Sequence, residues 1–198
     1  MKKLLFVLMI FSALTLSFNH VKAQAWEKGT KVLALGFGAS QFYHLDNYYY
    51  SGSGRIHNAY SPVTLQVNFQ GEFGIHKYLG LGFTTGIGGR GSLRHDYAGE
   101  LNIPIGMIFN FHFYQLIADK SAKNIHADKL DIYAGLSAGS GIAIAYYNDY
   151  YNDFTRVMPI AFGGVHLGIR YYFTPMVGVN LEAGIGKNLV NAGFVFKM

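Results

Sequence analysis

Apolar and polar residues alternate with a period of two along most of the chain after residue 23. Between Val63 and Gln70 every odd position is apolar and every even position is polar. Successive side chains of a β-strand point to opposite faces, so this period indicates strands whose two faces differ chemically. The pattern predicts eight strands, over residues 31–40, 63–75, 79–88, 103–113, 130–146, 157–173, 177–186 and 189–197.

One face of these predicted strands is apolar, and the other is rich in glycine with a few polar or charged groups. In a soluble sandwich the second face would meet water and would carry Lys, Glu and Thr, because glycine weakens strands. A narrow barrel has an interior that side chains just fill, and small residues relieve crowding there. The pattern therefore predicts an all-β fold: an eight-stranded antiparallel up-and-down transmembrane β-barrel whose apolar face meets lipid.

The links between the predicted strands also suit such a barrel. Long links at 41–60, 92–99 and 147–156 alternate with short turns at 76–78 and 174–176, which is the asymmetry of extracellular loops and periplasmic turns. The link 114–129 is too long for a minimal turn, and its composition suits a short helix. Tyrosines in and beside the long links indicate an aromatic girdle at the membrane surface, with a ligand-stacking surface as the alternative.

The first 23 residues have the pattern of a secretory signal peptide. Lys2 and Lys3 precede an apolar run, and the small residue Ala23 precedes a glutamine. The run ends at Leu16 and is shorter than the roughly 20 residues that a spanning helix needs. We expect cleavage after Ala23, which leaves residues 24–198 as an outer-membrane β-barrel domain.

Composition narrows the possible functions. Of 198 residues, 51% are hydrophobic, 14% are charged and none is cysteine. Low charge with many aromatic residues argues against disorder, and the absence of cysteine excludes disulfide scaffolds, thiol catalysis and Cys-ligated metal sites. The formal charge of +5 falls to +2 when Lys2, Lys3 and Lys22 leave with the signal peptide, so we expect no nucleic-acid partner.

The segment from Gly168 to Met198 combines a strand ending in Arg170-Tyr171-Tyr172-Phe173, a Thr174-Pro175 turn and an alternating terminal strand. It resembles the closing hairpins of PorT-like (OmpX-like) small outer-membrane β-barrel proteins, a family abundant in Bacteroidota. The resemblance extends loosely over residues 24–198 and implies a barrel in the cell outer membrane, without specifying any chemistry. It implies outer-membrane lipid, lipopolysaccharide and the barrel-insertion machinery as partners, the last through the C-terminal strand. We expect a monomer.

Signals for catalysis or metal binding are weak. Residues Gly135 to Gly139 match the G-x-S-x-G pattern, but they lie within a predicted strand and not at a strand-to-helix elbow. His112 and His166 fall in the inward phase and could meet inside the barrel. No histidine beyond residue 23 has Ser or Thr two residues later, and no short metal-ligand spacing recurs. We therefore expect no catalytic residue, no cofactor and no metal site.

The most informative polar set is charged and points inward. Unpaired charges in a narrow interior would be costly, so we expect an ion-pair network that plugs the barrel. Glu72 and Glu182 are expected to pair with Arg170, and a gated pore lined by the same charges is the alternative. The predicted members of this structural network are Glu72, Arg90, Asp131, Arg170, Glu182 and Lys197.

These expectations favour a non-enzymatic outer-membrane barrel with a structural, adhesive or accessory role that it exercises through its extracellular loops. A lipid-modifying enzyme with its site at the barrel rim is an alternative. A soluble secreted lipocalin-like barrel that binds a small apolar ligand is a third.

Overall fold

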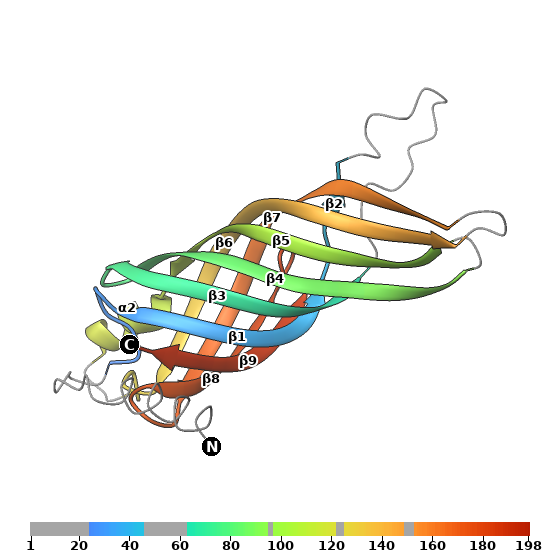
Figure 1. The fold of residues 1–198 in the computed structure, drawn as a ribbon. Coiled ribbons are helices and arrows are strands. Elements are labelled where there is room, and N and C mark those ends of the chain that lie inside the picture. Colours follow the sequence, from blue (N-terminus) through green and yellow to red (C-terminus); the bar gives the residue numbers. More distant parts are fainter. Residues whose placement is uncertain (1–23, 46–62, 95–96, 122–124, 149–152) are drawn as a thin grey trace, which may run out of the picture.

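A computed structural model describes residues 24–45, 63–94, 97–121, 125–148 and 153–198. Within these residues eight antiparallel strands form a closed ring (Figure 1), in which each strand pairs with the next along the chain and β1 pairs with β9. The eight strands are β1 (Lys31–Ser40), β3 (Thr64–His76), β4 (Leu79–Arg94), β5 (Tyr97–Phe111), β6 (Leu130–Asn148), β7 (Asp153–Tyr172), β8 (Val177–Gly184) and β9 (Val190–Lys197). The predicted eight-stranded barrel is confirmed, whereas the predicted signal peptide lies outside the described residues.

The two faces of the wall have the chemistry that the alternation predicts. In β3, Leu65 is 59% exposed on the outside, while its neighbours Thr64 and Gln66 are buried inside. A closed ring leaves no unpaired sheet edge, and this satisfies the backbone where no water is available. Exposed apolar side chains around a polar interior invert the arrangement of a soluble barrel, so the outer surface suits lipid.

The strands are unequal in length, and the two-residue strand β2 (Tyr43–His44) pairs with the part of β7 that β8 does not reach. β8 and β9 have 8 residues each, whereas β7 has 20 and pairs with β8 only between His166 and Tyr172. Nearer the start of β7, Ile160 and Ala161 pair with β2. The chain leaving β1 therefore crosses the end of the short β8–β9 hairpin and continues the wall there. The alternation did not predict β2.

The link between β5 and β6 contains the predicted short helix. α2 (Phe113–Lys120) begins where the sequence predicts the last residue of a strand, because β5 ends at Phe111. Lys77, in the β3–β4 turn, lies 2.7 Å from Asp119 of α2, and the hydrogen bond to Asp119 raises the pKa of Lys77. No helix among the described residues is long and apolar enough to cross a membrane.

The described chain ends, α2 and the β3–β4 and β7–β8 turns lie at one end of the barrel (Figure 1). Short turns of outer-membrane barrels face the periplasm, so we call this the periplasmic end. The ends of β4 and β6 and the starts of β5 and β7 lie at the opposite, outer end (Figure 1). The tyrosines at 48–50 and 60, which the sequence assigns to the membrane surface, lie outside the described residues.

Glycine at inward positions makes room for large side chains from neighbouring strands. A Cβ atom on Gly168 would lie 2.6 Å from Cε2 of Tyr133, which is fully buried. Such an approach is tighter than atoms tolerate, so Gly168 is needed for the Tyr133 ring to cross the interior.

We expect Gly168→Ala to lower the free energy of unfolding by roughly 1–3 kcal/mol, because the added methyl group overpacks the interior. Gly163→Ala is the matched control on the same strand, since the nearest atom to its Cβ, the Ser137 carbonyl oxygen, would be 3.9 Å away. Urea unfolding of both variants in lipid vesicles measures the difference. Equal effects of the two substitutions would contradict this packing.

Candidate functional site

Four charged side chains from different parts of the barrel meet near its periplasmic end. Arg170 of β7 places Nη2 2.5 Å from Oε2 of Glu72 and Nη1 3.5 Å from Oδ2 of Asp131. His112, just after β5, places Nε2 2.9 Å from Oε1 of Glu72 and Nδ1 2.8 Å from Oδ1 of Asp131. All four residues are buried, so the two carboxylates hold the two nitrogen-bearing groups without help from bulk water.

The contacts of His112 define its charge. A neutral imidazole donates a hydrogen bond from one ring nitrogen and accepts one at the other, whereas an ionised carboxylate can only accept. Both ring nitrogens of His112 face carboxylate oxygens, so with both carboxylates ionised the ring is an imidazolium that donates from each nitrogen. Trp26 stacks on the ring with 3.5 Å between centroids and an angle of 7° between planes, which holds the ring in this orientation.

A second group of polar side chains lies deeper in the barrel, next to this cluster. The carboxylate of Glu182 accepts hydrogen bonds from the Tyr133 hydroxyl at 2.7 Å and from the Lys187 ammonium at 2.8 Å. Lys187 also donates to the side-chain oxygen of Gln70. The guanidinium of Arg170 lies 4.2 Å from the centroid of the Tyr133 ring, so Tyr133 connects the two groups.

Lys187 reaches the interior because the β8–β9 turn folds inward. Gly186 has a φ of +94°, in the left-handed region that glycine adopts readily. On either side of it, Ile185 N donates to Val165 O at 2.9 Å and Leu189 N donates to Ala39 O at 2.8 Å. The turn is therefore bonded to both neighbouring strands.

Together the two groups form a cluster whose formal charges cancel. Unpaired charges at such depth would each cost several kcal/mol, and pairing each acid with a base avoids that cost. We call this set the interior network: the acids Glu72, Asp131 and Glu182 and the cations Arg170, His112 and Lys187.

Two residues that the sequence places in the network lie elsewhere. Arg90 is at the outer end, where its Nη2 lies 3.7 Å from Oε2 of Glu100. Lys197 is at the periplasmic mouth, where it donates to the carbonyl oxygen of Gln24 at 2.7 Å. Both positions have the inward phase, but they lie near opposite ends of the barrel, and phase alone carries no information on depth.

The expected pairing of Glu182 with Arg170 does not occur, because Lys187 takes the position next to Glu182. Lys187 escapes sequence reasoning because it lies in a turn, where the period of two ends. His112 and His166, which could have met, are separated by Tyr133, whose ring centroid lies 5.3 Å from one and 6.2 Å from the other.

The periplasmic mouth is closed by the segment that precedes β1. Trp26 is fully buried, and Ala25 N donates to Ala127 O at 2.8 Å. Gly80 leaves space for the indole, since a Cβ there would lie 2.9 Å from Cη2 of Trp26. Trp26, which stacks on His112, therefore also covers the interior network on its periplasmic side.

A buried apolar group lies in the outer half of the interior, among buried polar side chains such as Gln66 and Asn102. The rings of Phe42 and Phe162 meet edge to face with centroids 6.0 Å apart. Beyond them His44 Nε2 lies 3.1 Å from Oε1 of Glu100, both nearly buried. The buried apolar group consists of Phe42, Ala143, Ala145, Met158, Ile160 and Phe162.

The G-x-S-x-G match at residues 135–139 does not form a nucleophile elbow. Residues 135–139 lie in the middle of β6, paired with β5 and β7, whereas a nucleophile elbow needs a strand-to-helix turn. In the part of the chain that the structure describes, no group of three or more His, Asp or Glu residues could hold a metal ion.

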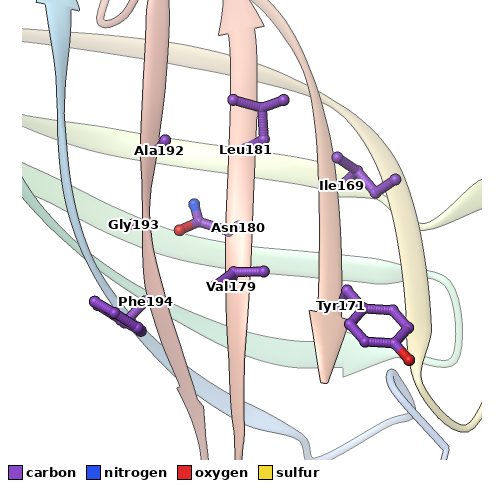
Figure 2. A pocket seen from close by; sticks show the side chains of 8 residues that line it. All are labelled: Ile169, Tyr171, Val179, Asn180, Leu181, Ala192, Gly193 and Phe194. Carbon is purple, nitrogen blue, oxygen red and sulfur yellow. The ribbon is translucent and has the colours of Figure 1, made fainter. Parts of the chain in front are cut away.

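On the outer surface, a shallow groove of about 500 Å³ crosses β7, β8 and β9. Figure 2 shows Tyr171, Val179 and Phe194 in one row across the three strands, and Ile169, Leu181 and Ala192 in the next. The register agrees, because Tyr171 pairs with Val179 and Val179 pairs with Phe194. The small residues Ala192 and Gly193 leave the depression between larger neighbours.

No protein-family model matches the chain, and no curated protein matches it. Among solved structures, the outer membrane protein OprG of Pseudomonas aeruginosa is similar, with a TM-score of 0.54 and 11% identity over 89% of this chain and 99% of that one. The N-terminal β-barrel domain of Pseudomonas aeruginosa OprF gives a TM-score of 0.48 and 11% identity over 87% and 98% of the two chains. At this identity the similarity to OprG concerns the fold alone.

The location of the protein follows from its own surface. The closed barrel exposes apolar side chains such as Leu65, Ile105 and Leu167 at 59% or more around its wall. Barrels with an outward apolar band are found in outer membranes. The protein is therefore an outer-membrane β-barrel.

We expect Arg170→Met to lower the free energy of unfolding by roughly 3–5 kcal/mol, because it leaves two buried carboxylates facing one cation. Lys77→Met serves as the control: the side chains of Lys77 and its partner Asp119 are 49% and 19% exposed, and exposed ion pairs contribute about 1 kcal/mol or less. Unfolding in lipid vesicles measures both. A small effect of Arg170→Met would show that the interior network does not stabilise the barrel.

Proposed function

We propose that this protein is a non-enzymatic outer-membrane barrel with a sealed interior, which acts as a structural, adhesive or accessory protein through its extracellular links. The observation that carries the proposal is the filled interior. Trp26, the interior network and the Phe42–Phe162 group follow one another from the periplasmic mouth outwards, and eight strands enclose little more space than side chains fill.

A sealed interior leaves the ends of the barrel for interactions with other molecules. The sequence between β2 and β3, residues 46–62, contains Tyr48, Tyr49, Tyr50 and Tyr60 together with Arg55 and His57. Tyrosine supplies a large contact area at low conformational cost and carries a hydroxyl for hydrogen bonding. This composition supports a role in contacting a partner outside the cell.

We also propose that the chain is related to the PorT-like barrels that its segment from Gly168 to Met198 resembles. Outer-membrane lipid, lipopolysaccharide and the insertion machinery are the proposed partners, and a monomer is the proposed state. The described strands support the monomeric state, because β9 completes the ring with β1 inside a single chain.

In planar bilayers, we expect the purified protein to show no stable open state over a range of voltages, because the side chains of the interior network and the Phe42–Phe162 group occupy the interior. Trp26→Ala tests the seal, since it removes the side chain that covers the periplasmic mouth, and Ile117→Ala on the exposed face of α2 is the control. A stable single-channel conductance of the unaltered protein would support a gated pore and contradict the proposal. Altered lipid A in a deletion strain would contradict the non-enzymatic role.

Replacing Tyr48, Tyr49, Tyr50 and Tyr60 by serine should reduce the attachment of intact cells to surfaces coated with glycans or matrix proteins by about tenfold, because tyrosines often carry much of the energy of an interface. Tyr78→Ser, at the periplasmic end, is the control and should leave attachment unchanged. Heat-dependent gel mobility verifies that each variant is folded. Equal attachment of all variants would argue against an adhesive role of this link.

A further inference from the structure

The groove across β7, β8 and β9 lies on the part of the wall that faces the periplasmic leaflet. Its lower row is formed by Tyr171, Val179 and Phe194, two residues from the pair Val177–Phe196 near the strand ends. At about 3.3 Å per residue, the two rows lie roughly 7 and 13 Å from that pair. Strands of such barrels tilt by about 40°, so these lengths correspond to about 5 and 10 Å along the membrane normal. The apolar band is about 25 Å tall, so the groove lies within one leaflet.

The walls of the groove match a hydrocarbon chain. Five of its lining residues expose large apolar surfaces. In Figure 2 four of these side chains lie on the strands to the right of Ala192 and Gly193, and Phe194 follows Gly193 on β9. Tyr171 contributes a phenol ring, and its hydroxyl provides a polar atom at the periplasmic side of the groove. A flexible acyl chain can follow this depression, because small residues allow close approach and dispersion contacts add up along its length.

A positive charge lies at the rim below the groove. Lys31 begins β1, the strand next to β9, and is exposed in the same outward phase as Leu35 and Phe37. Its carbonyl oxygen accepts a hydrogen bond from Met198 N at 2.9 Å, which places Lys31 beside the end of β9. Lys31 is level with Met198, beyond the pair Val177–Phe196, and adjacent strands are about 4.8 Å apart. A lysine side chain at this position therefore reaches the level of lipid phosphates below the groove.

We propose that the groove binds one acyl chain of an anionic phospholipid of the periplasmic leaflet, whose phosphate is held at the rim by Lys31. The groove is part of the lipid-facing wall, so lipid surrounds it in the membrane. We therefore favour a lipid over a protein segment as its occupant. The leaflet at this depth consists of phospholipid, whereas lipopolysaccharide occupies the outer leaflet. The site is independent of the role proposed for the extracellular links.

Photo-crosslinking tests the acyl-chain site directly. The full chain is folded into phosphatidylcholine vesicles that contain a trace of phosphatidylglycerol with a diazirine on its acyl chain, and labelled peptides are identified by mass spectrometry. We expect labels to concentrate on the peptides that carry the groove residues of β7, β8 and β9. Even labelling of the whole wall, including β4 and β5, would overturn the proposal.

Ala192→Phe fills the groove and should reduce labelling of these peptides by about fivefold, because the chain loses many small dispersion contacts. Ala138→Phe is the matched control, since Ala138 is also exposed on the lipid-facing wall but lies on β6, outside the groove. An added ring facing lipid does not oppose folding, and heat-dependent gel mobility verifies this. Unchanged labelling in Ala192→Phe would contradict the acyl-chain site.

Competition between headgroups tests the role of Lys31. In the unaltered protein we expect the phosphatidylglycerol probe to label the groove more than a phosphatidylcholine probe with the same acyl chains. Lys31→Gln should remove this preference, whereas Lys28→Gln, at an exposed residue of the segment before β1, should retain it. Equal labelling by both probes in the unaltered protein would overturn the anionic headgroup assignment.

Discussion

The buried guanidinium of Arg170 determines which side chains must surround it in the interior. A charge enclosed by a lipid-embedded wall cannot be hydrated by bulk water, so carboxylates must reach it from other strands. Glu72 and Asp131 do so from β3 and β6. Their remaining oxygens then require donors, and the imidazolium of His112 supplies two. One buried charge thereby connects the chain from β3 to β7 and requires the Trp26 cover.

The same requirement for satisfied polar groups shapes the wall. Lipid outside and a polar interior within fix the alternation of each strand, and closure of β1 on β9 removes the sheet edge. Where the short β8–β9 hairpin ends, its turn bonds to both neighbours and directs Lys187 inward. β2 continues the wall beyond that turn. β7 and β8 contribute to both surfaces: Tyr171 and Leu181 line the groove outside, and Arg170 and Glu182 belong to the network inside.

The sequence predicts the eight strands and their inner faces because a period of two is a local property, visible in windows such as 63–75. It does not predict β2, since two residues carry no period, nor the charge of His112, which depends on carboxylates from two distant strands. It selects Arg90 and Lys197 by phase, yet phase does not report depth along the barrel. It omits Lys187 because the inward fold of a turn depends on contacts with β1 and β7.

The central claim is that the six charges of the interior network cancel, and this depends on His112 being an imidazolium. The ¹⁵N chemical shifts of the His112 side chain, measured by NMR on the folded barrel at neutral pH, report the protonation of each ring nitrogen separately. The account predicts that both nitrogens carry a proton. A spectrum with one protonated and one bare nitrogen at His112 would contradict it, because one of the two carboxylates would then face a lone pair.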